Sequence, residues 1–164
     1  VASNPFLGDA DYFKGPEGDW QPPKAPNLIV PMHYYRPFEI THSVRHLQSK
    51  GRVQPDAYPP VADESFTSKD YRNRDVHFRR YADWCRANKV TPWIGEAGCR
   101  SEVPGRLNWF RDVIASAARV KVPVCWWSMD GFALSARWDG RRYNVGSPDV
   151  LQLITGSKSR LGGR

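Results

Sequence analysis

The stretch Thr91-Pro92-Trp93-Ile94-Gly95-Glu96-Ala97-Gly98 decides how this chain is interpreted. Its first part, from Thr91 to Gly95, is short and apolar, follows a helical pattern and ends at a glycine, which predicts a buried strand. Glu96 then lies at the carboxyl end of that strand, with glycines on both sides that let other groups approach closely. A carboxylate there costs free energy unless it is paired, hydrogen-bonded or used in chemistry. By itself the motif fits a salt-bridged structural glutamate and a catalytic glutamate equally well.

Strand and helix patterns alternate on both sides of this stretch. The expected strands are 27–35, 91–95 and 122–127, and the expected helices are 75–88, 105–119 and 148–155. Repeated strand–helix units predict parallel strands with helical crossovers, which is an α/β fold. The side chains that then lie at the carboxyl ends of strands are those of His33, Tyr35, Glu96 and Trp127. In a (β/α)8 barrel that end of the strands holds the active site.

The strand at 27–35 is bracketed by Pro26 and Pro37 and contains a histidine and a tyrosine. Because side chains alternate along a strand, His33 and Tyr35 share one face. Taken separately, each fits an ordinary core residue, either a hydrogen-bonded buried histidine or a packed aromatic ring. Their common face and their place at the strand end favour a functional role.

The remaining segments carry weaker patterns. We expect loops at 1–26 and 128–144, a long polar excursion at 36–70 with a short helix at 43–49, and a flexible tail at 156–164. On the helix at 75–88, the expected buried stripe consists of Val76, Phe78, Ala82 and Cys85.

The composition describes one globular domain, with 164 residues of which 40% are hydrophobic and 25% charged. No apolar run reaches the length of a membrane span. The net charge of +7 would suit a nucleic-acid partner, but the basic residues are scattered and no nucleic-acid motif accompanies them. Three cysteines, Cys85, Cys99 and Cys125, show neither metal-ligand spacing nor a disulfide framework, and we expect them to be small buried hydrophobes.

Three motifs in order resemble those of the family 5 glycoside hydrolases, the cellulase family. Residues 27–42 look like the sixth-strand region, 94–98 like the seventh-strand motif, and 125–128 like the eighth strand. The resemblance implies the C-terminal half of a (β/α)8 TIM barrel, in which residues 1–164 run from the fifth-strand loop to the eighth helix. It implies no metal and no cofactor, and it suggests an extracellular or periplasmic location.

The resemblance also assigns roles to residues. It implies that Glu96 is the catalytic nucleophile of a retaining enzyme that cleaves a β-linked polysaccharide, with β-1,4-glucan favoured. His33 and Tyr35 correspond to a His-x-Tyr pair that binds sugar and orients the nucleophile. Trp127 corresponds to the tryptophan that stacks on sugar, and Trp126 is the weaker candidate, since packing suits it better.

One departure from the family pattern concerns the acid/base glutamate, which the family carries in an Asn-Glu-Pro motif that this chain lacks. Retaining glycosidases need two carboxyl groups about 5–5.5 Å apart. Glu39, Glu102 and Asp130 are the remaining acids within conceivable reach, and each fits a solvated charge better. Half a barrel also leaves open sheet edges, which predicts a partner. We expect a complementary N-terminal half-barrel chain rather than self-association.

Two other functions stay open at this point. A non-catalytic carbohydrate-binding or interaction module derived from such an enzyme would explain the missing acid. A nucleic-acid binder rests on charge alone, and salt-dependent DNA binding would be its minimal sign. The sequence does not decide which polysaccharide the chain recognises, because the family uses cellulose, mannan and mixed-linkage glucan.

Overall fold

A computed structural model describes residues 22–42, 58–59, 69, 71–127, 132–134 and 136–156. The expected helix at 43–49 and nearly all of the expected loop at 1–26 and of the tail at 156–164 lie outside these residues. The elements in chain order are β1 (Ile29–Tyr34), α1 (Phe38–Thr41), α4 (Arg74–Ala87), β2 (Thr91–Ala97), α5 (Arg106–Val120), β3 (Val124–Trp126), β4 (Ala136–Trp138), β5 (Tyr143–Val145) and α6 (Pro148–Thr155).

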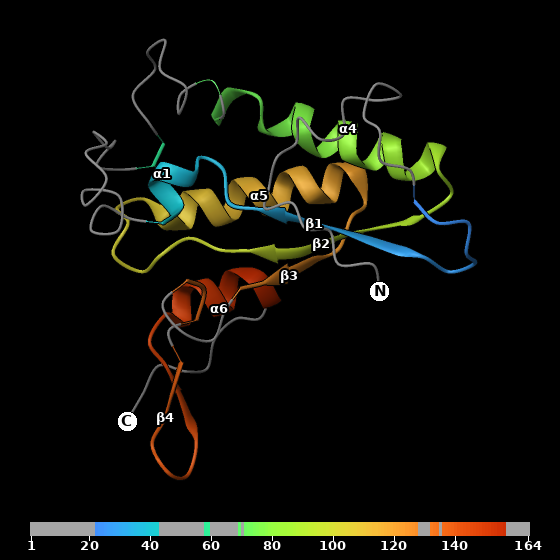
Figure 1. Ribbon diagram of the computed structural model, residues 1–164. Coiled ribbons are helices and arrows are strands. Elements are labelled where there is room, and N and C mark those ends of the chain that lie inside the picture. The colour runs from blue at the N-terminus through green and yellow to red at the C-terminus, as the bar shows by residue number, and fades with distance from the viewer. Residues whose placement is uncertain are drawn as a thin grey trace.

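In the described part of the chain, three strands form one sheet in the order β1-β2-β3, and both neighbouring pairs are parallel. Figure 1 shows α4 and α5 along one face of this sheet, where α4 contacts β2 and α5, and α6 packs on α5. The predicted α/β class with parallel strands and helical crossovers is therefore confirmed. None of the described helices is long and apolar enough to cross a membrane.

The core lies between the sheet and these helices. Burial alternates strictly along β1, so that Val30, Met32 and Tyr34 point to the helices while their neighbours are partly exposed. The ring of Tyr34 meets the edge of Phe78 from α4, with ring centres 4.8 Å apart. Trp109 of α5 is fully buried, and its indole N–H donates to the backbone carbonyl of Arg36, 2.9 Å away. This bond fixes the chain just after β1 to the helix layer.

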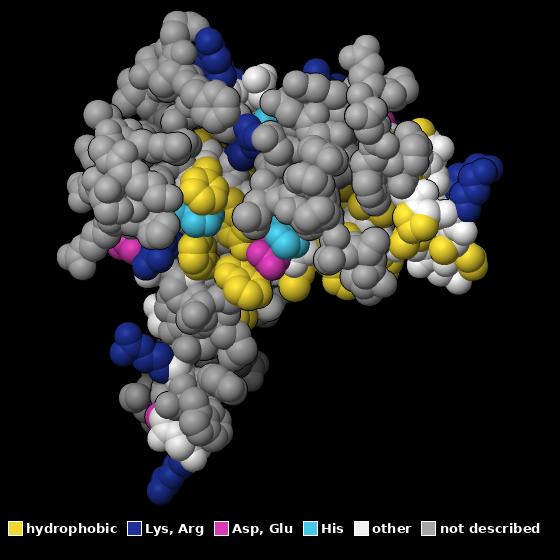
Figure 2. All heavy atoms as spheres, viewed as in Figure 1, with side chains coloured by type: hydrophobic (Ala, Val, Ile, Leu, Met, Phe, Trp, Pro, Cys, Tyr) yellow, Lys and Arg dark blue, Asp and Glu magenta, His cyan; other side chains and the backbone are white. Residues whose placement is uncertain are grey.

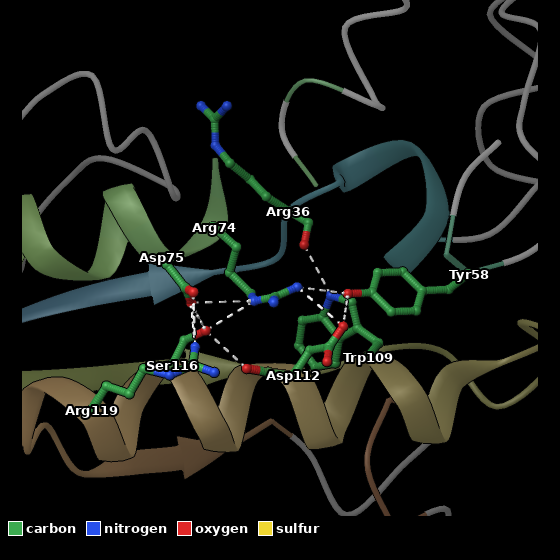
Figure 3. Close-up of polar contacts among 8 residues, drawn as sticks. All are labelled: Arg36, Tyr58, Arg74, Asp75, Trp109, Asp112, Ser116 and Arg119. Atoms are coloured by element: carbon green, nitrogen blue, oxygen red, sulfur yellow. Dashed lines mark hydrogen bonds and ion pairs between the residues drawn. The ribbon is translucent and has the colours of Figure 1, made fainter. Parts of the chain in front are cut away.

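A polar network between α4 and α5 joins the two helices (Figure 3). The Arg74 guanidinium donates to the hydroxyl of Ser116 at 2.9 Å and to the carboxylate of Asp112 at 3.1 Å. Arg119 pairs with both carboxylate oxygens of Asp75, at 2.8 and 2.9 Å. Tyr58 donates its hydroxyl to Asp112 at 2.6 Å, so a residue far from both helices in sequence is tied to them.

The hydroxyl of Tyr81 from α4 is inserted between two neighbouring strands. It accepts a hydrogen bond from the backbone N–H of Trp93 in β2 and donates to the carbonyl of Val30 in β1. Pro31 and Pro92 lack an N–H for the sheet, so the strands are joined at this level through a side chain from the helix layer. The hydroxyl thereby fixes the helix to the sheet near the amino-terminal ends of the two strands.

Several sequence predictions were wrong in detail. On α4, Phe78, Ala82 and Cys85 are buried as expected, but Val76 is 40% exposed. The other buried residues of this helix are His77 and Tyr81. Cys125 is exposed, whereas Cys85 and Cys99 are buried as expected. The segment expected as one loop at 128–144 contains β4, which pairs with β5 as an antiparallel hairpin. A hairpin this short carries too few residues for its alternation to stand out in the sequence.

Candidate active site

A β-bulge in β2 determines where the Glu96 side chain points. Met32 of β1 pairs with Ile94 of β2, but the next residue of β1, His33, pairs with Glu96, so Gly95 is an extra residue. Without the bulge, alternation from the buried Ile94 would direct Glu96 into the helix layer. The extra residue directs its carboxylate to the side of the sheet that carries His33, which is a common effect of bulges beside functional sites.

Gly95 is required here because of the space around it. A Cβ atom at this position would lie 3.0 Å from the Cβ of Pro31 and 3.4 Å from Nε2 of His33. A side chain would therefore press on Pro31, and its Cβ would already touch the imidazole that faces Glu96. The glycine is a consequence of how closely the two strands approach at the bulge.

Two side chains from the end of β1 converge on one oxygen of the carboxylate. The hydroxyl of Tyr35 donates a hydrogen bond to Oε2 of Glu96 at 2.9 Å. The Nδ1 atom of His33 lies 3.4 Å from the same oxygen. The side chains of His33 and Glu96 remain 23% and 27% exposed, so the pair is accessible from outside. The structure thus brings together three of the residues that the sequence singled out.

Tyr35 remains a hydrogen-bond donor because its phenol is held in the neutral form. Burial raises its pKa well above the ordinary value of 10.0, and the hydrogen bond to Glu96 raises it further. A tyrosinate beside a carboxylate would place two negative charges in contact, which is unfavourable. The neutral phenol therefore keeps its proton for the hydrogen bond that holds the Glu96 carboxylate.

The two tryptophans of the third strand point to opposite sides. Trp126 faces the helices, where its ring lies 5.2 Å from that of Phe110, and it packs against the core. Trp127 is 47% exposed, and its backbone N–H donates to the carbonyl of Ala97 at 2.8 Å. Gly98 makes this approach possible, since a Cβ there would collide with the carbonyl of Trp127. Of these two tryptophans, Trp127 is the one whose ring is available to a ligand.

A second carboxylate for proton transfer is not assigned among the described residues. Glu102 is 48% exposed and pairs with Arg100 at 2.8 Å, as expected of a surface charge. Asp130 lies outside the described residues, and the structure does not describe the side chain of Glu39. In the same described ranges, no group of three His, Cys, Asp or Glu side chains is arranged to hold a metal ion.

Sequence reasoning missed two features of this site. It did not anticipate the bulge, although a glycine inside a strand pattern is a known sign of one. It also missed a cluster of rings beside Tyr35, formed by Phe38, His42 and Phe132. Phe38 and His42 fall in the segment expected as a polar excursion, and Phe132 comes from a distant loop, so no local pattern connects them.

Comparisons with known proteins bear on the fold of the chain. No family model and no curated protein matches it. Among solved structures, a hyperthermophilic endo-β-1,4-glucanase in complex with substrate is similar with a TM-score of 0.63 and 21% identity, over 90% of this chain and 44% of that chain. An endoglucanase of Thermotoga maritima in complex with mannotriose is similar with a TM-score of 0.58 and 22% identity, over 82% of this chain and 42% of that chain.

A glycoside hydrolase family 5 lichenase from a Caldicellulosiruptor species, in complex with cellotetraose, is similar with a TM-score of 0.59 and 19% identity. The similarity covers 90% of this chain and 40% of the lichenase chain. The chain thus spans less than half the length of the solved structures that it resembles. At these identities the likeness concerns the fold, and it confirms the resemblance seen in the motifs: the chain has the fold of part of a family 5 glycoside hydrolase domain.

Proposed function

We propose that this chain is the nucleophile-bearing, C-terminal half of a retaining family 5 glycoside hydrolase that cleaves a β-linked polysaccharide. The observation that carries the proposal is the convergence of Tyr35 and His33 on the partly exposed carboxylate of Glu96. A buried hydrogen-bonded tyrosine beside a structural glutamate needs no opening to the outside, whereas a nucleophile does. Trp127 supplies an exposed ring on the same side of the sheet.

The proposed reaction proceeds in two displacements. In the first, an oxygen of Glu96 attacks the anomeric carbon, a glycosyl ester bond forms, and the leaving oxygen departs with the electron pair of the cleaved bond and takes up a proton. In the second, water attacks the same carbon, gives up a proton, and releases the Glu96 carboxylate. Tyr35 and His33 hold the carboxylate in position throughout.

In our proposal, the acid that protonates the leaving oxygen lies outside the described residues of this chain. A parallel sheet is normally covered on both faces, but the described helices cover only one face of β1, β2 and β3. Both edge strands would continue into further strands of a (β/α)8 barrel. The missing strands would close the barrel and bring the acid/base carboxylate, whether they belong to a separate chain or to the same polypeptide.

The substrate class follows from the chemistry of similar proteins and remains a proposal for this chain. The structures that resemble it were solved with mannotriose, with cellobiose and with cellotetraose, all of which are short saccharides. We propose a β-1,4-linked glucan as the substrate. A flat exposed ring such as that of Trp127 suits the apolar face of a sugar ring.

The nucleophile can be tested in the full chain without the missing half. The probe is a 2-deoxy-2-fluoro-cellobioside with a dinitrophenolate leaving group. Dinitrophenolate departs without being protonated, so the reaction with this probe does not need the missing acid. We expect mass spectrometry of peptides to find the fluoro-sugar ester on Glu96, and no ester in the Glu96→Gln variant. Labelling of another carboxylate would contradict the assignment of the nucleophile.

The half-barrel part of the proposal is tested separately. The full chain alone should not hydrolyse β-glucan and should self-associate in light scattering, because general acid catalysis is worth about 10²–10⁴-fold and an uncovered sheet face attracts a partner. Coexpression with the remaining strands of a (β/α)8 barrel should restore a monodisperse particle and activity. A monodisperse chain with full glucanase activity would refute the half-barrel and would require an acid within this chain.

A non-catalytic carbohydrate-binding module is the alternative that one observation favours, namely that no described residue is assigned as the acid. The two functions differ in a single experiment. A binding module takes up saccharide but forms no ester with the fluoro-sugar, whereas the proposed enzyme half does both.

A further inference from the structure

The backbone that follows β1 is held by side chains, because the sheet ends before it. The last strand residue comes one position before Tyr35, whose hydroxyl donates to Glu96. The backbone carbonyl of Tyr35 accepts a hydrogen bond from the hydroxyl of Thr41 at 2.5 Å. The next carbonyl, that of Arg36, accepts from the indole of Trp109 at 2.9 Å. A carbonyl buried without a partner costs free energy, so these two donors determine how the chain leaves the sheet.

Thr41 also joins the two segments that carry the candidate site. It is the last residue of α1 and is fully buried, although threonine is mostly found exposed. Its hydroxyl bonds the chain just after β1, and its own carbonyl accepts from the backbone N–H of Arg100 at 3.0 Å. Arg100 lies in the segment that follows β2. Thr41 therefore fixes the end of β1, which bears Tyr35, against the end of β2, which bears Glu96.

The hydroxyl of Thr41 has one proton, and the distances indicate which atom receives it. The possible acceptors are the carbonyl of Tyr35 at 2.5 Å, Nδ1 of His42 at 3.0 Å and the carbonyl of Phe38 at 3.4 Å. The contact with Tyr35 is the shortest, so the proton is donated there, and the hydroxyl oxygen is left to accept from His42. The Thr41 proton is thus committed to the backbone of the residue whose own hydroxyl holds Glu96.

Thr41 is out of reach of a substrate. Figure 2 shows an acidic side chain beside a histidine on one face of the molecule, with hydrophobic side chains around them. His33 and Glu96 are partly exposed, whereas Tyr35 is 7% exposed and Thr41 is 0% exposed. A residue placed in this way can affect chemistry at Glu96 only through the groups that it holds.

We propose that Thr41 is a positioning residue, which holds the Tyr35 backbone so that the phenol reaches Oε2 of Glu96. The inference rests on the proposed function, in which Tyr35 holds the nucleophile. A shift of the Tyr35 backbone is carried to the far end of a rigid ring, and a hydrogen bond weakens steeply as its geometry is lost. Loss of the Thr41 hydroxyl should therefore loosen the bond between Tyr35 and Glu96 without removing any group that touches the saccharide.

A double-mutant cycle on the full chain tests this role, with the rate at which the 2-deoxy-2-fluoro-cellobioside labels Glu96 as the readout. Thr41→Val removes the hydroxyl and nearly keeps the shape of the side chain. It should slow labelling about two- to tenfold at saturating probe and leave the probe concentration for half-maximal rate unchanged. Tyr35→Phe should slow labelling about ten- to hundredfold, and adding Thr41→Val to it should slow labelling no further.

Two further variants serve as controls for the loss of a buried hydroxyl. Thr41→Ser keeps the hydroxyl and should be labelled at the wild-type rate. Ser116→Ala removes a buried hydroxyl from the network between α4 and α5, and it should leave the labelling rate unchanged. Thr41→Ala repeats the cycle with a smaller side chain if Thr41→Val does not fold.

The outcomes separate the inference from the proposed function. If Thr41→Val slows labelling equally with Tyr35 and with Phe at position 35, or slows it in neither, the positioning role is overturned and the proposed function stands. A wild-type chain that is not labelled on Glu96 overturns the proposed nucleophile. Urea unfolding of the same four proteins then still tests the role of Thr41. Thr41→Val should cost less stability in the Tyr35→Phe background, and strictly additive losses would overturn the inference.

Discussion

The two faces of the three-stranded sheet differ in almost every respect. On the helix side, Val30, Met32 and Ile94 are at most 2% exposed and pack among aromatic rings. On the other side, Trp93 is 39% exposed, Trp127 is 47% exposed, and Cys125 is exposed as well. The same strands thus supply a finished core on one face and an open surface on the other.

The candidate catalytic residues lie on the less covered of these two faces. The polar pair of His33 and Glu96 lies on the open face, and the bulge at Gly95 is what directs Glu96 there. Apolar residues such as Trp93 lie on the same face without the helices that cover the other side. Within the described residues, the face that carries Glu96 is therefore the one without a helix layer.

The largest effect is expected for Glu96→Gln on the open face. In the completed barrel, turnover of β-glucan should fall by about 10³-fold or more, because an amide cannot act as the nucleophile. The binding of cellotetraose should be largely retained. Steady-state kinetics and calorimetry on the same preparation measure both quantities.

Glu102→Gln is the matched control, since Glu102 is an exposed carboxylate paired with Arg100. Its turnover should equal that of the wild type. Full activity in Glu96→Gln would remove the central residue of the proposed site.

The comparison of the faces is sharpened by a pair of neighbouring substitutions in β2. Ile94→Ala should lower the free energy of unfolding by about 2–5 kcal/mol, because it opens a cavity in the packed layer. Trp93→Ala removes a larger side chain from the open face, yet it should change stability by only about 0.5 kcal/mol. Urea unfolding of the full chain measures both.

Trp93→Ala should in addition reduce self-association in light scattering, because it removes apolar surface from the open face. Equal losses of stability in the two variants would show that the open face is covered within this chain after all.

The two tryptophans of the third strand test the same contrast at a smaller scale. Trp127→Ala should weaken cellobiose binding about three- to tenfold through the loss of a stacking face. Trp126→Ala should lower the unfolding temperature, since its ring packs on Phe110, but should leave the affinity of the folded protein unchanged. An affinity loss in Trp126→Ala with an intact fold, and none in Trp127→Ala, would reverse the assignment.

The smallest effect is the change in stability expected for Asp75→Asn, in the polar network between α4 and α5. Burial raises the pKa of Asp75, but the Ser116 hydrogen bond and the nearby arginines outweigh it and hold the pKa below 3.8. A lowered folded-state pKa stabilises the protein at pH values above the unfolded pKa, and the contribution is lost as the pH falls through the folded value. Asp75→Asn should therefore cost about 0.2–1 kcal/mol near neutral pH, as is usual for half-exposed pairs.

Urea unfolding at about pH 7 and at about pH 3 measures this difference. The gap between wild type and Asp75→Asn should shrink in acid, where the wild-type carboxylate begins to take up its proton. A gap that widens in acid would mean that another group controls it.

The sequence by itself determined the order of the elements, the parallel sheet and the residues at the strand ends. It could do so because strand and helix periodicities are local, and because a strand end is marked by nearby Gly and Pro. The prediction that His33 and Tyr35 lie on the same face followed from the alternation of side chains along one strand. The motifs around Glu96 carried the family resemblance that the fold comparison confirms.

Only the tertiary structure decided which way Glu96 points, because a bulge depends on how β1 and β2 pair and not on either strand alone. For the same reason it decided that Val76 and Cys125 are exposed, since burial depends on which neighbouring elements are present. The ring cluster of Phe38, His42 and Phe132 joins two distant segments, and no local pattern encodes such a contact. Contacts between segments far apart in sequence arise from packing, which is where sequence periodicity carries no information.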